Sequence, residues 1–437
     1  MRLSVRYTTI GLSLLAIATA GMTIPASATS APTPGITNTQ VSVGAIVTQS
    51  GSLAADFQPY LYGVEAYFNY VNGGGGVFGR HVVVTHALDD QSNPTNDTTD
   101  ARDLVTADHV FAIVGVATAL FNGGAAYLKT TPTPTFGYAT SNIWSGPSNF
   151  FADYGSVVDY NSSVPDFAYV AKKVGGTKIA LIALNYPSSQ DECQPALTQL
   201  KKTYGDTVAY SNLQEPLFDA NFSTDVTKMR SAGVNMVISC MDVGSDVAFS
   251  QAMLGQGMTN VPQLWLDGYD RDVLKSNAPY MSKVYLMLQH VPFEAAASYP
   301  NAYPGLNLYF SQMSKSGYSS SEYSDVALMG WESAELFTQG LRAAGKNPTQ
   351  AAVNAAINKI KADTGGGVAA PTDWAVGHTK ATSPACVAFV ETKDTSGSSP
   401  AFTQVFNTRS DPWVCFPLAT KVNIAAPVKP PAGTPGA

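Results

Sequence analysis

Short apolar runs alternate with amphipathic stretches over the first third of the chain. The apolar runs 41–47, 81–88, 110–115 and 135–137 predict strands, and the stretches around Gly63 and Tyr67 and over 97–107 predict helices. Strands that alternate with helices at this spacing are joined by right-handed crossovers and form a parallel sheet. In such a sheet, the loops at the carboxyl ends of the strands are where ligands bind.

A second alternating series begins near residue 165. Its predicted strands are 178–184, 208–213, 236–240 and 263–266, and its predicted helices are 165–174, 193–203, 223–232 and 245–256. Because no low-complexity linker separates the two series, the pattern predicts two α/β lobes that face each other. The segment 284–292 is expected to return to the first lobe, where helices 303–316, 322–344 and 348–361 pack.

The predicted fold class is α/β, with two doubly wound parallel-sheet lobes. The predicted boundaries are a signal peptide at 1–28, a flexible leader at 29–38, lobe 1 at 39–152 plus 290–363, lobe 2 at 153–289 plus 364–420, and a disordered tail at 421–437. The tail is predicted as disordered because proline and alanine dominate it.

Composition and the amino terminus indicate a protein outside the cytoplasm. The chain has 437 residues, 45% of them hydrophobic, and a formal net charge of −7, which gives no basis for nucleic-acid binding. Arg2 and Arg6 precede an apolar run at 10–20 and the small-residue site at Ala28, as in a secretory signal. We expect cleavage after Ala28, with an uncleaved anchor as the alternative, and no lipoprotein because no cysteine lies near the site.

The four cysteines all follow the signal peptide. Four cysteines allow three pairings, and an oxidising compartment favours some pairing. We favour Cys193 with Cys240 and Cys386 with Cys415, because each pair belongs to one local region of the pattern. A metal site is the rival interpretation, but the cysteines show no CxxC spacing and no histidine lies nearby.

Motifs for other chemistry are weak in this chain. The Gly74 to Gly79 spacing precedes Arg80-His81 instead of the lysine and hydroxyl of a phosphate loop. The acidic stretch 89–100 has Pro94 where a calcium loop needs glycine. Since the five histidines lack metal spacing and no Gly-x-Ser-x-Gly elbow occurs, we expect no metal, no cofactor and no enzymatic activity.

Hydroxyl, amide and acidic residues follow most predicted strands. In the first lobe they lie in 48–51, 89–90, 116–119 and 137–141, and in the second in 185–189, 241–242 and 267–269. Several of these loops precede helices, whose first-turn amides bind carboxylates, although each polar residue by itself could be only a helix cap. Their convergence between two lobes predicts a small-molecule cleft.

Short motifs in residues 44–115 resemble the opening lobe of the leucine/isoleucine/valine-type periplasmic binding proteins. They are Thr48-Gln-Ser-Gly51, Gly63-Val-Glu-Ala66, the turn ending in Gly79-Arg80, Asp89-Asp90-Gln-Ser-Asn-Pro94, Ala101-Arg-Asp-Leu-Val105 and Val110-Phe-Ala-Ile-Val-Gly115. The resemblance covers most of the chain after residue 38 and is most specific up to Gly115. It implies the type I binding-protein fold, with three crossovers forming a hinge between the lobes.

The resemblance also implies a set of ligand-binding residues. In the first lobe, a loop with Thr118 and Ala119 and the segment Gly137, Tyr138, Ala139, Thr140 and Ser141 would hold a ligand carboxylate. In the second lobe, Asp267 would meet a ligand ammonium group, and Ser188 lies where the family has a tyrosine. Asp56 and Asp242 stand where the family has aromatic residues.

These departures change the expected ligand. Additional carboxylates disfavour an amino acid with an apolar side chain and favour a ligand with further amino or hydroxyl groups. The resemblance implies a monomeric solute-binding protein that closes on an amino-acid-like, amine, amide or polyol ligand and delivers it to an ABC permease. The alternatives are a ligand-sensing receptor subunit, a secreted hydrolase that uses carboxylates such as Asp242 and Asp267, and a structural envelope protein.

Overall fold

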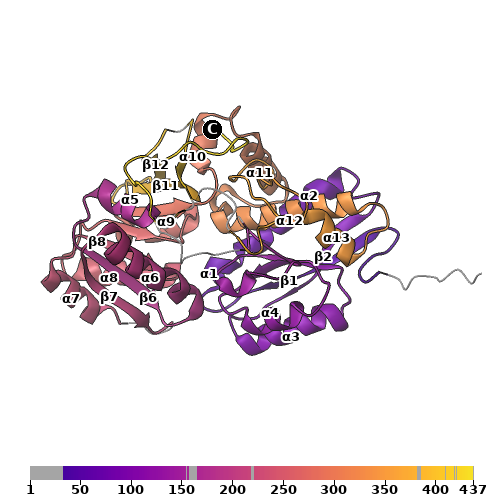
Figure 1. Cartoon of the computed structure of the whole chain (residues 1–437), viewed down its shortest axis with the longest axis horizontal. Helices are drawn as coiled ribbons and strands as arrows, with labels where there is room; N and C mark the ends of the chain where they lie inside the picture. Colours follow the sequence, from indigo (N-terminus) through magenta and orange to yellow (C-terminus); the bar gives the residue numbers. More distant parts are fainter. Residues whose placement is uncertain are drawn as a thin grey trace, which may run out of the picture. The chain divides into compact units, whose positions relative to one another are not determined.

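The computed structural model describes residues 33–436 except 154, 157–164, 218–220, 381–384, 409, 418 and 420 (Figure 1). The predicted signal peptide and residues 29–32 of the leader lie outside the described residues. Residues from Thr33 onward form one compact unit. The predicted α/β class is confirmed, with strands in two separate sheets.

The first sheet is entirely parallel and has the strand order β2-β1-β3-β4-β5. Its strands are β1 (Gln40–Val47), β2 (His81–Leu88), β3 (Ala112–Ala117), β4 (Thr135–Gly137) and β5 (Phe150–Ala152). The inner strand β3 is apolar and buried along its whole length, and β1 is buried from Val43 onward, because helices cover both faces, whereas the edge strand β2 is partly exposed.

Two groups of helices cover the first sheet, on opposite faces (Figure 1). On one face lie α1 (Ala54–Phe57), α2 (Pro59–Gly73), α11 (Pro304–Lys315), α12 (Asp325–Ala344) and α13 (Gln350–Ile357). On the other lie α3 (Pro94–Thr106), α4 (Asn122–Leu128) and the 3-10 turn η1 (Asn142–Trp144). The late helices therefore return to the first lobe, as the sequence predicts.

Helices α2 and α12 approach each other through facing glycines. A Cβ atom on Gly63 would lie 1.7 Å from the carbonyl oxygen of Ala327, and one on Gly330 would lie 1.9 Å from that of Tyr60. Neither position has room for a side chain, so the two backbones touch. This contact fixes the position of α12 against α2.

The second sheet has the strand order β12-β11-β10-β9-β8-β6-β7, with β13 paired to β11. Its parallel strands are β6 (Ile179–Leu184), β7 (Val208–Glu215), β8 (Met236–Cys240), β9 (Gln263–Trp265) and β10 (Val284–Leu288). The antiparallel strands are β11 (Ala385–Lys393), β12 (Ala401–Val405) and β13 (Val414–Phe416). The sheet is thus parallel where helices alternate with strands and antiparallel in β11, β12 and β13.

Helices also cover both faces of the second sheet. One face packs against α5 (Pro165–Val174), α6 (Pro187–Gln199) and the π-helical turn η2 (Leu200–Tyr204). The other packs against α7 (Ser223–Ala232) and α8 (Val243–Gly255). The remaining elements are α9 (Arg271–Asn277), η3 (Ala278–Tyr280), α10 (Phe293–Ser298) and η4 (Ser320–Glu322).

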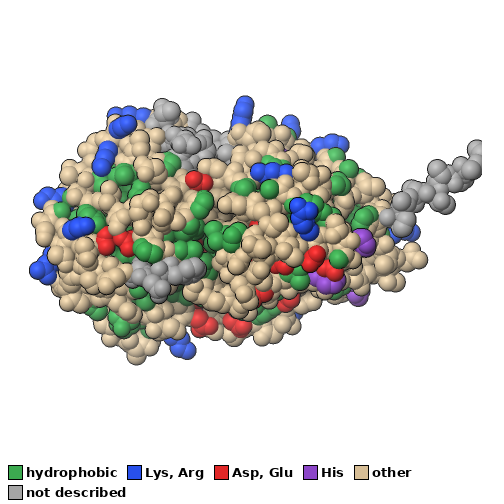
Figure 2. Space-filling view, turned by 90° about the horizontal axis from the view of Figure 1, so that it is seen from below, with side chains coloured by type: hydrophobic (Ala, Val, Ile, Leu, Met, Phe, Trp, Pro, Cys, Tyr) green, Lys and Arg blue, Asp and Glu red, His purple; other side chains and the backbone are tan. Residues whose placement is uncertain are grey.

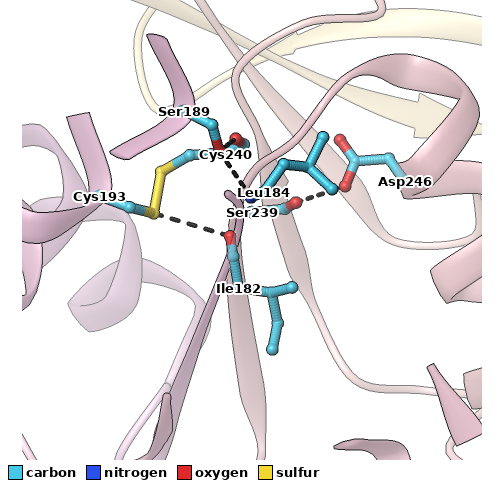
Figure 3. The surroundings of a disulfide bond; sticks show 7 residues. All are labelled: Ile182, Leu184, Ser189, Cys193, Ser239, Cys240 and Asp246. Atoms are coloured by element: carbon cyan, nitrogen blue, oxygen red, sulfur yellow. Dashed lines mark hydrogen bonds between the residues drawn. A yellow bond between two sulfur atoms is a disulfide. The ribbon is translucent and has the colours of Figure 1, made fainter. Parts of the chain in front are cut away.

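Both predicted cysteine pairs are bonded, Cys193 to Cys240 and Cys386 to Cys415. The first bond joins α6 to the end of β8 (Figure 3). The second joins directly paired residues of β11 and β13. Each disulfide therefore lies within the second lobe.

The chain passes between the sheets three times, after β5, after β10 and before β11. We call these stretches the crossing segments. The second and third pair with each other, since His290 forms a bridge with Ala369 and the amide of Val291 donates to the carbonyl of Val368 at 2.8 Å. The first lies beside the third, where the amide of Ser156 donates to the carbonyl of Gly377 at 3.1 Å.

Three segments differ from the sequence prediction. Residues 284–288, expected to return to the first lobe, form β10 of the second sheet. Residues 364–380, assigned to lobe 2, pack on the first lobe, where the Trp374 ring lies 5.4 Å from that of Phe151. Residues 421–436, predicted as disordered, make defined contacts: the amide of Val428 donates to the carbonyl of Cys415 at 2.8 Å, and the Trp413 indole donates to the carbonyl of Pro435 at 2.7 Å. Proline-rich composition hid these contacts, because they use backbone carbonyls.

Candidate functional site

Hydrogen bonds connect the carboxyl ends of the two sheets. The amide of Val243 donates to Asp56 at 3.2 Å, and the Tyr138 hydroxyl donates to Asp267 at 2.8 Å. The Ser188 hydroxyl donates to the carbonyl of Ala119 at 3.2 Å. Each bond joins a residue of the first lobe to one of the second, so the loops predicted to meet do meet.

The hydroxyl of Thr118 is directed at a carboxylate of the protein itself. It donates to Asp90 at 2.5 Å, and Thr48 donates to the other oxygen of Asp90 at 2.7 Å. Burial raises the pKa of Asp90, and these two hydroxyls oppose the rise. In this arrangement Thr118 supports the loop after β3, and the ligand role predicted for it stays a prediction.

The segment after β4 is held by its own backbone and by β3. The amide of Tyr138 donates to the carbonyl of Val116 at 2.9 Å, and the Thr140 hydroxyl lies 3.5 Å from the carbonyl of Thr118. Gly137 has no room for a Cβ, which would lie 2.3 Å from the same Val116 oxygen. Ala139 packs against the core and Ser141 is buried before η1, so Tyr138 reaches farthest toward the second lobe.

Asp242 caps α8. Its carboxylate accepts from the amide of Ser245 at 2.9 Å and from the hydroxyl of the same serine at 2.6 Å. Beside it, the hydroxyl of Ser189 accepts from the amide of Leu184 at 2.7 Å and donates to the carbonyl of Cys240 (Figure 3). The Cys193–Cys240 disulfide thus fixes the start of α6 against the end of β8, which positions both Ser188 and Asp242.

The structure adds acidic residues that the sequence interpretation missed. Charge interactions link Asp267 with Glu192 in α6 and with Asp325 at the start of α12, and they link Asp246 in α8 with Asp56. We call the set the facing-end cluster; its members are Asp56, Glu192, Asp242, Asp246, Asp267 and Asp325. No sequence pattern marks Glu192 or Asp325, because Glu192 lies within helix α6, past the loop that follows β6, and Asp325 begins a helix that follows no strand directly.

Burial makes the ionised forms of Asp56 and Asp267 costly. Burial, reinforced by the charges of Asp242 and Asp267, raises the pKa of Asp56 well above its usual value. Burial and Asp242 raise the pKa of Asp267 to about 6, although the hydrogen bond from Tyr138 opposes the rise. Tyr186, which lies close enough for the same charges to act on it, keeps its proton for the same reasons.

No member of the facing-end cluster forms an ion pair with a basic side chain among the described residues. One oxygen of Asp56 is buried there without a hydrogen-bond partner. Within the same residues, no group of three His, Cys, Asp or Glu side chains is arranged to hold a metal. The arrangement therefore offers hydrogen-bond acceptors to a partner that brings donors, and it offers negative charge from Asp267 above a pKa of about 6.

Lys and Arg side chains are few and scattered on the face of the molecule shown in Figure 2. No helix in the described part of the chain has the length and apolar character of a membrane span.

The family model described as periplasmic binding protein matches residues 40–397. The chain belongs to this family, as the motifs in its first lobe indicated. A search among curated protein sequences found no match.

Solved structures of transporter binding proteins share the fold. A fatty acid ABC transporter substrate-binding protein from Thermomonospora curvata aligns with a TM-score of 0.72 and 14% identity over 92% of this chain and 98% of its own. The branched-chain amino acid transporter substrate binding protein LivJ from Streptococcus pneumoniae, in complex with isoleucine, has a TM-score of 0.67 and 18% identity over 84% and 100%. A solute binding protein from Rhodopseudomonas palustris, in complex with p-hydroxybenzoic acid, has a TM-score of 0.68 and 18% identity over 84% and 98%.

Proposed function

We propose that the protein is the extracytoplasmic solute-binding component of an ABC importer and captures a small polar ligand between its two lobes. The family, the two-lobed fold and the polar contacts between the sheet ends support this proposal. A ligand shifts the equilibrium from the open to the closed arrangement of the lobes only to the extent that it binds the closed form more tightly than the open form. A membrane permease then receives the solute, and the protein itself catalyses no reaction.

The ligand class follows from which groups at the sheet ends remain unpaired. Three of the hydroxyl donors are already used: Thr118 donates to Asp90, Ser188 to a carbonyl, and Tyr138 to Asp267. Two acceptors of the facing-end cluster are buried without a partner among the described residues, the second oxygens of Asp56 and Asp246. Within the predicted set of amino-acid-like, amine, amide and polyol ligands, we therefore favour one with a positively charged amino group.

The observation that carries this choice is the facing-end cluster, six carboxyl groups without a basic partner among the described residues. Leaving such groups unpaired in a buried site is costly, and a cationic ligand would relieve the cost. The relatives with known ligands do not decide the matter for this chain, because their ligands are chemically diverse.

A thermal-shift panel tests the proposal, since a ligand of the native state raises Tm by mass action. We would compare 1,4-diaminobutane, lysine, leucine and sorbitol at equal ionic strength, followed by calorimetry of any hit. An increase with the amines and none with leucine is expected. Tight leucine binding without amine binding would refute the ligand class, and no response to a broad solute library would refute solute binding itself.

A control variant is available on the surface. Asp103, exposed on α3, carries the same charge as Asp267 but lies outside the facing-end cluster. Asp267→Asn should strongly reduce the amine response, and Asp103→Asn should leave it unchanged. Equal loss in both variants would show that the amine responds only to net charge.

A further inference from the structure

A small cavity lies in the first lobe beside the crossing segments. Phe151, Ala152 and Asp153 at the end of β5 form one wall, Glu332, Ser333 and Leu336 of α12 form another, and residues 363–374 close it. We call it the hinge cavity. Its volume is about 20 Å³, which exceeds the roughly 10–15 Å³ that one water molecule needs.

All three crossing segments adjoin this cavity. Asp153 begins the first of them, directly after β5. Ala369, which lines the cavity in the third, forms the bridge with His290 in the second. A change of charge or hydration in the cavity therefore acts at the place where the lobes are joined.

Three carboxyl groups line the cavity, and they differ in how far they are paired. Asp363 accepts from the Trp374 indole at 2.9 Å and from the amide of Gly365 at 3.2 Å. Asp153 accepts weakly from Tyr60 at 3.3 Å and from Ser333 at 3.4 Å, and its second oxygen has no partner among the described residues. The cavity is thus acidic and only partly supplied with donors.

Glu332 is the most poorly satisfied of the three. Its side chain is 6% exposed, and its buried Oε1 has no hydrogen-bond partner among the described residues. Gly365, with φ of +57°, lets the backbone pass close to it, because a Cβ there would lie 2.7 Å from the Glu332 side chain. The fold therefore holds this carboxyl against the cavity instead of letting it turn to solvent.

The surrounding groups do not neutralise the cavity. Helix α2 contributes the neutral Tyr60, and α12 contributes Glu335 and Arg342. The charge of Arg342 acts on Glu335, whose pKa it lowers. His378 and His290 lie beside the cavity walls, and burial lowers the pKa of each. Burial, with the charges of Asp153 and Asp363 next, raises the pKa of Glu332 well above its usual value.

We propose that the hinge cavity is a proton-binding site that couples the joint between the lobes to pH. In this state, Glu332 and Asp153 face the cavity as neutral carboxylic acids. Each acid donates its proton in a hydrogen bond to water in the cavity or to a nearby acceptor. Loss of these protons leaves unpaired negative charge among the crossing segments and loosens their contacts. The protein then holds its lobes together less firmly as pH rises.

The sign of the effect follows from linkage. A carboxyl that keeps its proton in the folded state, at a pH where the unfolded chain has lost it, makes stability fall as pH rises above the unfolded value. Glu332→Gln mimics the protonated acid at every pH. The Tm of wild type should therefore fall more than that of Glu332→Gln between pH 5 and pH 9, by about 3 °C or more.

The experiment uses the mature chain, with thermal unfolding and small-angle X-ray scattering at pH 5, 7 and 9. Asp103→Asn, the exposed control with the same change of charge, should follow wild type. The radius of gyration of wild type should increase at pH 9, and that of Glu332→Gln should increase less. If Glu332→Gln fails to fold, Asp153→Asn serves in its place, with the same expected direction.

Two results would overturn the proposal. In one, the Tm values of wild type and Glu332→Gln run parallel across the pH range, so that Glu332 has only a packing role. In the other, ammonium or potassium ions raise the Tm of wild type at pH 9 relative to sodium and leave that of Glu332→Gln unchanged. That result would mean an ionised cavity occupied by a small cation.

Discussion

Helix α12 carries acidic residues into two regions that look alike in chemistry and differ in surroundings. At its start, Asp325 belongs to the facing-end cluster, where residues of both lobes meet. Two turns further along, Glu332 faces the hinge cavity, which is lined by the first lobe and by residues of the crossing segments. In neither region does a basic side chain pair with the carboxyl groups among the described residues.

The difference lies in what can neutralise the charge. Under the proposed function, the facing-end cluster lies between two lobes that separate, so a solute can enter and bring positive charge. The hinge cavity, with a volume of about 20 Å³, has room for a water molecule, and the neutralising species that we propose there is the proton. Higher pH should therefore favour ligand binding at the first region and weaken the joint at the second.

The largest expected effect concerns the disulfide that lies beside the facing-end cluster. Removing the Cys193–Cys240 bond with alanines should cost about 2–5 kcal/mol of stability and should also weaken ligand binding, because this bond positions Ser188 and Asp242. Calorimetric unfolding and ligand titration measure both quantities. Removal of Cys386–Cys415 is the matched control and should lower stability while leaving affinity intact; equal loss of affinity would show that the first bond has no special role.

Asp267→Asn should remove a charged acceptor from the facing-end cluster and leave the hinge cavity unchanged. We expect a loss of about 2 kcal/mol in binding, or roughly thirtyfold in Kd for the amine. The pH dependence of Tm should keep its wild-type slope. A changed slope would mean that the two regions are electrostatically one.

Ligand affinity should itself depend on pH. Because the pKa of Asp267 is raised to about 6, this carboxyl is ionised above pH 7 and protonated at pH 5. A cationic ligand needs the ionised form, so affinity should weaken by up to about tenfold per pH unit below pH 6. Titration calorimetry between pH 5 and pH 8 checks this, and an affinity that is flat over that range in wild type would contradict it.

The smallest expected effect concerns the contact between lobes. Tyr138→Phe removes the hydroxyl that donates to Asp267 across the lobes, which should change ligand affinity by roughly 1 kcal/mol. The same change should raise the pKa of Asp267, since this hydrogen bond favours its ionised form. The midpoint of the affinity profile should then move to higher pH; an unmoved midpoint would show that the bond does not form in solution.

Much of the fold could be predicted from local pattern. Strands such as β1 and β8 are apolar runs bounded by polar turns, and their observed limits differ from the predicted ones by at most one residue. The pattern missed β5 and α9, which are too short to show a period, and α4, in which adjacent glycines conceal the helix. Helix α6 begins earlier than predicted because Pro187 starts it.

The facing-end cluster was only partly accessible to sequence reasoning. Asp242 and Asp267 follow strands, so their convergence could be predicted from topology, whereas Asp56 was predicted from the family resemblance. Asp325 and Glu192 lie in helices whose approach depends on tertiary packing. The hinge cavity was not predicted at all, because Glu332 sits among apolar residues of α12 and Asp153 and Asp363 are distant in sequence.

The pairing of the second and third crossing segments limits how the lobes move. Two hydrogen-bonded segments, joined where Val291 meets Val368, bend readily out of their common plane. They resist sliding within that plane, since sliding would break the bond between them. Such a joint restricts the lobes to rotation about one axis. Opening would then follow a single arc, and the permease would encounter the same pair of surfaces at every delivery.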